Sequence, residues 1–267
     1  MRPLFIIGLP KTRQTQRELQ LEAKQHNDML QFGFKDDYYN LTLKAISAMG
    51  WIVENCNKSD YLVKCDDDVL INVDLLDKII KNRQFADGIT GKMAVTRSNR
   101  WTGHKWYMPR DVYTSSYYHF LYGFSYVMTI KSAKQMYKTL SSSNFSEPVL
   151  DIDDLFMTGV LAQRSRVRIY HDNRFDYYCH TNVCPLNNML AIHGCDSVNK
   201  TLYIWDKWQK SNDSQCFDRR FPFDVDFGND FRVSFSINSF RDFVRNISQQ
   251  FFGQPFTSSN IRLYNYN

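Results

Sequence analysis

The stretch "YLVKCDDDVLIN", residues 61–72, joins an apolar run to three consecutive aspartates and then to a second apolar run. Residues 61–65 are rich in strand-forming side chains, so we expect a central strand there. Carboxylates packed side by side repel one another and are costly to bury unless a positive group lies among them. The run Asp66, Asp67 and Asp68 therefore raises the question of which cation it serves.

Upstream of this stretch, apolar periodicity predicts a strand followed by helices. Residues 4–9 form a short apolar run ended by Pro10, as in a buried parallel strand. Residues 14–31 are polar with scattered apolar positions, which indicates a helix and a loop. For residues 40–55, one buried helix face is predicted by the apolar positions at helical spacing, Leu41, Ala45, Ala48 and Ile52.

Downstream, strands and helices continue to alternate. Asn72 is placed to cap a helix that carries Leu75, Leu76, Ile79 and Ile80. Residues 122–130 are typical of a strand and residues 131–140 of a helix. In residues 147–163 a second acidic cluster lies at the start of a helix, where the helix dipole favours negative charge. The alternation predicts an α/β sheet, in which ligands bind beyond the carboxyl ends of strands, and Asp66 to Asp68 lie at such an end.

The composition indicates a folded protein with a substantial core. The chain has 267 residues, is 43% hydrophobic and carries a net charge of +5 without any long Lys/Arg block, which argues against nucleic-acid binding. No apolar run approaches the ~20 residues of a membrane helix, and the first residues lack a signal-peptide cleavage pattern. Residues 209–267 are rich in Phe, Asn, Ser and Asp and show no clear period.

Cysteines and glycosylation sequons together favour a secretory-pathway protein. The six cysteines are Cys56, Cys65, Cys179, Cys184, Cys195 and Cys216. Their spacing is not that of a zinc site, and Cys179-x4-Cys184 matches one only weakly. Asn-x-Ser/Thr sequons occur at Asn40, Asn57, Asn144, Asn199, Asn212 and Asn246.

The three aspartates suit a hard divalent cation. On an extended segment, Asp66 and Asp68 point the same way and Asp67 points away. Two carboxylates on one side suit Mg²⁺ or Mn²⁺, which keep coordination positions for water or substrate phosphates. The alternative is a loop of solvated aspartates.

Three further features have a functional and a structural interpretation. The segment "DIDD" (151–154) offers a general base, or only a helix start with favourably placed acids. His193 is a metal ligand or a structural histidine. The aromatic and charged residues of 101–113, among them Lys105 and Asp111, suit a sugar ring or form a packed loop.

Several stretches, in one order, resemble the β-1,3-glycosyltransferases of glycosyltransferase family 31, animal enzymes of the Golgi. The resemblance covers roughly residues 4 to 208, and "KWYMPRDVY" is close to the galactosyltransferase branch. The matching stretches are "FIIGL", "DDYYNLTLKAISAMGW", "YLVKCDDDVLIN", "KWYMPRDVY", "YGFSYVMTIKSAKQMYKT", "DDLFMTG" and "AIHGCDSVNKTLYIWDKW".

This resemblance implies an α/β sandwich of the GT-A, nucleotide-diphospho-sugar transferase type, with a mixed, mostly parallel central sheet. It implies a catalytic domain at residues 1–208 and an extension of unknown role at 209–267. The family's membrane anchor, stem and first core strand have no counterpart here. We therefore expect an N-terminally incomplete domain, attached to a membrane only through an anchor absent from this chain.

The implied reaction is inverting transfer of galactose or N-acetylhexosamine from a UDP-sugar to a glycan hydroxyl, giving a β-1,3 bond. The acceptor glycan is carried by a glycoprotein or glycolipid on the lumenal side of the Golgi membrane, and the cofactor is Mn²⁺ or Mg²⁺. Asp154 is the expected base, with Asp153 as the competing or supporting residue. The other implied site residues are Asp66, Asp68 and His193 for metal, Asp66, Asp67 and Lys64 for cofactor and nucleotide, and Trp106, Tyr107, Arg110 and Gly123 for substrate.

Two alternatives remain open at this stage. A catalytically inactive relative would act as a sugar-binding or chaperone-like protein of the secretory pathway. A secreted calcium-binding module is the weaker alternative, because the aspartate run lacks the spacing of a calcium loop.

Overall fold

The computed structural model describes residues 2–56, 58–97, 99–110, 117–179, 188–195, 197–210 and 261–263. The chain divides into two compact units. The first comprises Met1–Lys58, Lys134–Ser165 and Val233–Asn267, and the second comprises Ser59–Ala133 and Arg166–Arg232. One of the points at which the chain passes from one unit to the other lies within helix α4 (Ile130–Leu140).

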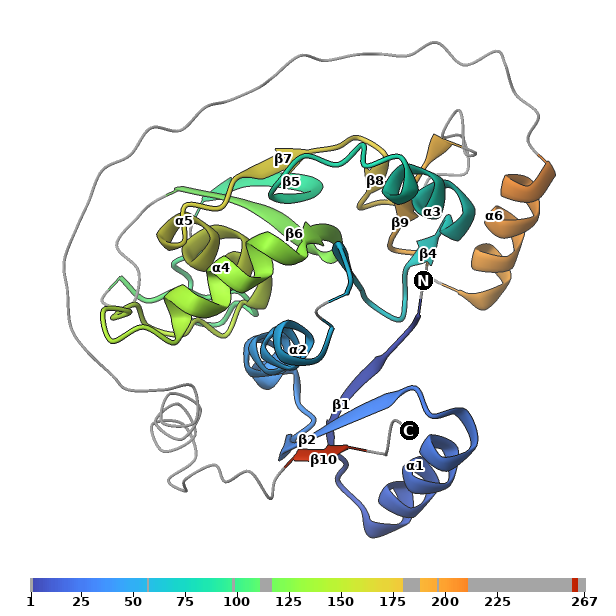
Figure 1. The fold of residues 1–267 in the computed structure, drawn as a ribbon, viewed down its shortest axis with the longest axis horizontal. Coiled ribbons are helices and arrows are strands. Elements are labelled where there is room, and N and C mark those ends of the chain that lie inside the picture. Colours follow the sequence, from blue (N-terminus) through green and yellow to red (C-terminus); the bar gives the residue numbers. More distant parts are fainter. Residues whose placement is uncertain are drawn as a thin grey trace. The chain divides into compact units, whose positions relative to one another are not determined.

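The first unit contains a three-stranded sheet in the order β1-β2-β10 (Figure 1). Its strands are β1 (Phe5–Leu9), β2 (Met29–Lys35) and β10 (Ile261–Leu263). β1 and β2 are parallel, and β10 is antiparallel to β2. Helix α1 (Arg13–His26) connects β1 to β2 and lies beside the sheet, where Gln16 and Gln31 exchange side-chain hydrogen bonds of 2.9 Å.

The predicted first strand is confirmed, but its burial is not. β1 lies at the edge of its sheet, so Phe5 is 53% and Leu9 39% exposed. The prediction for residues 14–31 captured helix α1 but missed the beginning of β2. Almost every side chain of β2 is buried, and a strand buried on both faces lacks the polar alternation that would have marked it.

Helix α2 (Leu41–Asn55) follows the short 3₁₀ turn η1 (Tyr38–Asn40) and buries a different face from the predicted one. Leu41, Ala45, Ala48 and Ile52 are only half-buried. The buried positions form two neighbouring stripes at helical spacing, Thr42/Ile46/Met49 and Leu43/Ser47/Gly50. These stripes include small and polar residues, so a search for apolar positions alone does not find them. The buried Thr42 hydroxyl has a hydrogen-bond partner, because it donates to the Leu150 carbonyl at 2.6 Å.

The acidic segment does begin a helix, as predicted. Residues 153–164 are helical throughout, with η2 (Leu155–Leu161) in π-type geometry and α5 (Ala162–Arg164) at the end. The side chains of η2 are almost all buried, so this helix is a core element of the first unit. Its polar start therefore stays at the surface while the rest is fixed by packing.

The second unit contains two sheets. The larger has the order β3-β6-β5-β7 and the smaller β4-β9-β8. The strands are β3 (Tyr61–Cys65), β4 (Leu70–Ile71), β5 (Ile89–Arg97), β6 (Tyr117–Thr129), β7 (Ile169–His171), β8 (Phe175–Asp176) and β9 (Ala191–Ile192). Helices α3 (Val73–Lys81) and α6 (Val198–Lys210) complete it, and Figure 1 shows α3 beside β4 and β8.

Most elements predicted around the aspartates are confirmed. Residues 61–65 form β3, and Asn72 caps α3 by accepting from the Leu75 N–H at 3.0 Å. Within its unit, however, β3 lies at the edge of the sheet and is not central.

The sheets are mixed, as predicted, but parallel pairs do not predominate. The 13-residue strand β6 runs antiparallel to both of its neighbours, β3 and β5, so two of the three pairs in the larger sheet are antiparallel.

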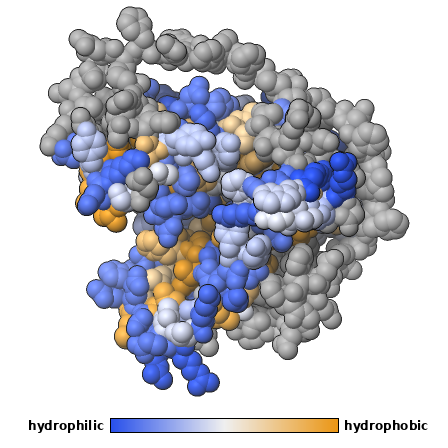
Figure 2. Space-filling view, turned by 180° about the vertical axis from the view of Figure 1, so that it is seen from behind, coloured by the Kyte–Doolittle hydropathy of each residue, from blue (hydrophilic) through white to orange (hydrophobic). Residues whose placement is uncertain are grey.

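Helix α3 covers the core of the second unit. The buried cluster is Leu76, Ile79, Phe85, Phe124, Val127, Phe175, Leu190 and Ala191, which joins α3 to β6, β8 and β9. Within the described ranges, no helix is long and apolar enough to cross a membrane. On the face seen in Figure 2, hydrophilic side chains cover much of the coloured surface, with hydrophobic ones between them.

Candidate functional site

Strand pairing in the larger sheet fixes Asp66. β3 and β6 are antiparallel with Lys64 opposite Tyr126 and Cys65 opposite Ser125, and the Asp66 N–H donates to the Phe124 carbonyl at 2.9 Å. The strand ends at Cys65, and Asp67 and Asp68 lie in a turn. The predicted alternation of the three side chains is therefore wrong, because it assumed an extended segment.

Strand pairing in the smaller sheet brings Asp68 to His193. Leu70 pairs with Ile192 and Ile71 with Ala191 in antiparallel register. Residues just before β4 therefore meet residues just after β9. The Asp68 Oδ2 lies 3.5 Å from the His193 Nε2, so two of the three predicted metal ligands converge.

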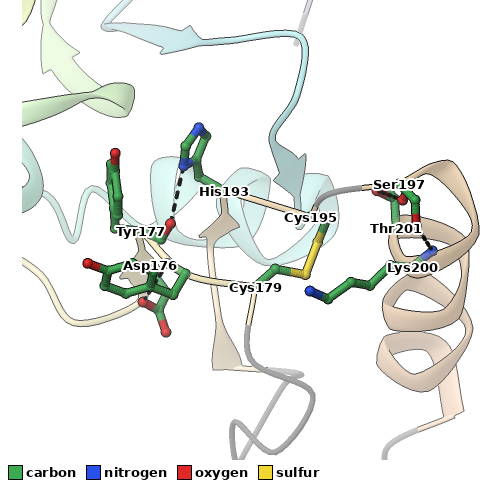
Figure 3. Close-up of a disulfide and its surroundings, with 9 residues drawn as sticks. Asp176, Tyr177, Cys179, His193, Cys195, Ser197, Lys200 and Thr201 are labelled. Carbon is green, nitrogen blue, oxygen red and sulfur yellow. Dashed lines mark hydrogen bonds between the residues drawn. A yellow bond between two sulfur atoms is a disulfide. The ribbon is translucent and has the colours of Figure 1, made fainter. Parts of the chain in front are cut away.

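The His193 ring is held in one orientation by its surroundings (Figure 3). Its Nδ1 lies 3.2 Å from the Tyr177 carbonyl oxygen, and its backbone N–H donates to the Asp176 carbonyl at 2.9 Å. The Phe124 and Tyr177 rings pack on it with centroids 5.4 and 5.0 Å away. A carbonyl only accepts, so Nδ1 carries a proton toward Tyr177, and Nε2 faces Asp68, where it would be free to bind a cation as in a metal-ligating histidine.

Asp66 has a different partner. The Lys64 ammonium donates to both the Asp66 carboxylate and the Gly123 carbonyl, so three predicted site residues meet in one contact. In the part of the chain that the structure describes, no three His, Cys, Asp or Glu side chains gather as a metal site. To become a third ligand, Asp66 would have to leave its ion pair with Lys64 and bind the metal ion instead.

The donor set nevertheless fits a divalent cation. Asp68 supplies a carboxylate oxygen and His193 an imidazole nitrogen, both of which Mn²⁺ accepts. Such an ion fills its other positions with water or substrate phosphate oxygens, so it needs few protein ligands.

Cys65 adjoins this cluster without sharing its chemistry. Its thiol donates to the Asp66 carbonyl at 3.0 Å. Desolvation, followed by the charge of Asp66, raises the pKa of the Cys65 thiol to about 12, although the residue keeps exposed surface. The thiol is neutral at physiological pH and is neither a ready metal ligand nor a nucleophile.

The predicted base residues lie in the first unit. The Asp154 Oδ1 accepts from the Leu155 N–H at 2.8 Å, and Thr158 donates to the Asp154 carbonyl at 2.7 Å. Asp153 is half-buried beside it. Asp151, the first residue of the acidic segment, was not chosen as the base, but desolvation raises the pKa of its carboxyl, although the residue is exposed. A carboxylate of this kind is a candidate proton acceptor.

The predicted substrate loop exposes its aromatic side chains. Met108 anchors the loop: it is 3% exposed, its N–H donates to the Asn99 carbonyl at 2.8 Å, and its carbonyl accepts from Arg100 at 2.6 Å. Trp106 is 47% and Tyr107 36% exposed. Arg110 is exposed as well, whereas Asp111 falls outside the described residues.

Three contributors to the site were not singled out from the sequence: Phe124, the Tyr177 carbonyl, and a disulfide between Cys179 and Cys195. The disulfide engages Cys179, so the weak match of Cys179-x4-Cys184 to a zinc site gains no support. Clustered cysteines were the one signal for it, and they do not give the pairing.

The asparagine of one sequon has a structural role. Asn40 is 9% exposed and its side-chain amide donates to the Lys35 carbonyl at 2.8 Å, so it is unsuited to carry a glycan in the folded chain. Asn144 and Asn199 are exposed. Asn57, Asn212 and Asn246, like Cys184 and Cys216, fall outside the described residues.

Comparison with known proteins decides the family. The model of the galactosyltransferase family matches residues 1–173. The chain belongs to the galactosyltransferase family. This confirms the resemblance drawn from the motifs between residues 4 and 208, although the family match itself ends before β8, β9 and His193.

Relatives in this galactosyltransferase family carry related names. Mouse "Beta-1,3-galactosyltransferase 1" is 26% identical over 221 residues, covering 80% of this chain and 65% of the relative. "Lactosylceramide 1,3-N-acetyl-beta-D-glucosaminyltransferase" of Xenopus tropicalis is 30% identical over 216 residues, covering 76% and 55%. Mouse "Beta-1,3-galactosyltransferase 5" is 27% identical over 226 residues, covering 81% and 70%. The chain thus spans 55% to 70% of the length of these relatives.

Proposed function

We propose that this chain is the catalytic part of an inverting transferase that moves a hexose from a UDP-sugar to a glycan hydroxyl and forms a β-1,3 bond. The observation that carries the proposal is the convergence of Asp68 and His193, with the histidine Nδ1 held by the Tyr177 carbonyl and its Nε2 facing the carboxylate, in a galactosyltransferase family member. An aspartate run alone is a common surface feature. A carboxylate aimed at a fixed imidazole is far more specific.

The donor nucleotide would be held by the second unit. Asp68 and His193 would hold Mn²⁺ or Mg²⁺, joined by Asp66 if it leaves Lys64. When bound, the ion supplies positive charge that stabilises the departing diphosphate. Lys64 would then be released to approach the negative nucleotide, and Asp67 lies in the same exposed turn.

Asp154 would act as the base. As the acceptor hydroxyl attacks the anomeric carbon, its proton passes to the Asp154 carboxylate, and the bond from that carbon to the diphosphate oxygen breaks with its electron pair leaving on UDP. Attack from the face opposite UDP inverts the configuration. Asp153 would support the site. Trp106, Tyr107 and Arg110 offer exposed stacking and hydrogen-bonding groups for a sugar.

A disulfide and exposed sequons support a location in the secretory pathway. A disulfide between Cys179 and Cys195 and exposed sequons at Asn144 and Asn199 suit an oxidising lumen. We therefore place the chain on the lumenal side of the Golgi membrane, with a glycoprotein or glycolipid as acceptor.

A donor panel tests the proposal. Purified protein is incubated with Mn²⁺ and UDP-galactose, UDP-N-acetylglucosamine or UDP-N-acetylgalactosamine, and UDP release and β-1,3-linked product are measured. We expect one donor to be used, with UDP-galactose first, and Asp154→Asn to be inactive. An inactive sugar-binding relative would bind ligand and release no UDP from any donor, an outcome that would reject the catalytic proposal.

A further inference from the structure

We propose that the disulfide between Cys179 and Cys195 is a positioning element for His193, which sets the imidazole for metal and nucleotide binding. This inference rests on the proposed function, because it assumes that His193 serves the donor site. The bond would act through His193 and touch neither the ion nor the substrate.

The first observation is a constant register. β8 and β9 are parallel, with Phe175 opposite Ala191 and Asp176 opposite Ile192, an offset of 16 residues. Tyr177 and His193 keep this offset and are joined by the Nδ1 contact of 3.2 Å. The disulfide also joins residues 16 apart, with Cα atoms 5.0 Å from one another. It therefore closes the same ladder two residues beyond the histidine.

The second observation is that the ladder is short. β8 and β9 have two residues each, which is too few for hydrogen bonds alone to hold strands firmly together. Beyond them, the main-chain support of His193 is its N–H bond to the Asp176 carbonyl. The disulfide, two residues after the histidine, prevents the segments that follow β8 and β9 from separating.

The third observation is the close approach at Gly194. This residue has φ +77°, and a Cβ there would lie 3.2 Å from the Tyr177 carbonyl oxygen, the atom that accepts from His193. The backbone between His193 and Cys195 therefore passes close to that carbonyl. Figure 3 shows the same carbonyl joined to the His193 ring. Glycine permits this path and the disulfide fixes its far end.

The disulfide is itself anchored in a core. Cys179 packs with Met189, Ile192 and Ile204, and Leu70 and Cys195 lie against this cluster. Leu70 belongs to β4, the strand that follows Asp68, so the cluster links the supports of both predicted ligands. Loosening the disulfide would therefore disturb His193 more than the rest of the unit.

A double-mutant cycle separates positioning from general stability. The Kd for UDP with saturating Mn²⁺ is measured for the parent, Cys179→Ser/Cys195→Ser, His193→Ala, and the triple variant. We expect the double cysteine variant to weaken binding roughly 10-fold or more, the usual effect of losing a residue that orients a ligand. In the His193→Ala background the same change should have almost no further effect, and losses that multiply would overturn the inference. Ile204→Val, which loosens the same cluster but leaves the disulfide, should leave the Kd unchanged.

A second readout does not need UDP. At pH 8, nitrogen NMR of the imidazole should show His193 with its proton on Nδ1 in the parent. In the cysteine variant, or in folded parent reduced with a phosphine if that variant does not fold, the tautomers should mix. An unchanged His193 signal after loss of the disulfide would refute the inference. If the parent does not bind UDP, the proposed function fails, and this measurement still decides the role of the disulfide.

Discussion

The Asp68 carboxylate and the His193 imidazole lie 3.5 Å apart because β4 and β9 pair in antiparallel register, although the two residues are 125 positions apart in the chain. The contact is polar and partly exposed, with 63% of the Asp68 side chain and 21% of the His193 side chain accessible. The pair therefore joins a fixed imidazole to a carboxylate that remains open to a ligand.

Asp68→Asn should weaken Mn²⁺-dependent UDP binding at least about 10-fold, because the amide loses the charge that a divalent ion requires. Asp67→Asn removes the same charge from the same turn at a residue outside the Asp68–His193 pair, so we expect it to raise the Kd clearly less. Calorimetric titration of UDP into each variant with Mn²⁺ gives both values. Equal losses for the two variants would mean that the turn acts only through its total charge.

Asp154→Asn should reduce transfer by about 10²–10⁴-fold and leave UDP binding nearly unchanged, since a positioned base contributes about this much. Initial rates with saturating donor and acceptor measure the loss. We expect Asp153→Asn to reduce the transfer rate less than Asp154→Asn does, and Asp151→Asn to retain most of the activity. If Asp151→Asn is the variant that loses transfer while Asp154→Asn does not, the raised pKa of Asp151 marks the base, and the assignment moves to it.

Asn40→Ala should destabilise the first unit by roughly 1–3 kcal/mol, because the partly buried hydrogen bond from the Asn40 side chain to the Lys35 carbonyl is lost. Thermal unfolding should show a decrease in Tm of several degrees. Asn144→Ala, at an exposed sequon, should shift stability by less than about 0.5 kcal/mol. A glycan found on Asn40 in folded secreted protein would contradict the burial described for this side chain.

Alkylation of Cys65 should be slow at pH 8 and rise steeply only above about pH 10, because the thiolate reacts and the pKa of this thiol is raised to about 12. Peptide-resolved mass spectrometry after timed iodoacetamide treatment gives the rate at each pH. Asp66→Asn removes the second cause of the shift and should move the rise to lower pH. Rapid labelling at pH 8 in the folded parent would show that the thiol is not desolvated.

Local signals in the sequence were sufficient for several elements. Side-chain period and capping chemistry gave β1, β3, α3, α4 and the acidic helix start, because each of these depends on neighbouring residues. They failed for β2, whose burial on both faces removes alternation, and for the face of α2, where Thr42 and Ser47 are buried polar residues.

The site was less predictable because its geometry arises from distant pairing. Of the three predicted metal ligands the structure brings Asp68 and His193 together, but strand alternation was the wrong reason for choosing Asp66 and Asp68, since Asp67 and Asp68 lie in a turn. The pairing of Lys64 with Asp66 and Gly123 depends on the register between β3 and β6. The Cys179–Cys195 connection depends on the β8–β9 register, which no local pattern encodes.

Titration of UDP into the parent protein, with and without Mn²⁺, tests the proposed metal-dependent donor site most directly. With Mn²⁺ we expect saturable binding of one UDP per chain, and with a chelator in place of the metal a loss of affinity of at least about 10-fold, because Asp68 and His193 would hold an ion whose positive charge offsets the negative charge of the diphosphate. The same measurement on His193→Ala should give weak binding in both conditions. UDP affinity that does not change with Mn²⁺, or absence of UDP binding by folded parent protein, would contradict a metal-dependent UDP-sugar transferase.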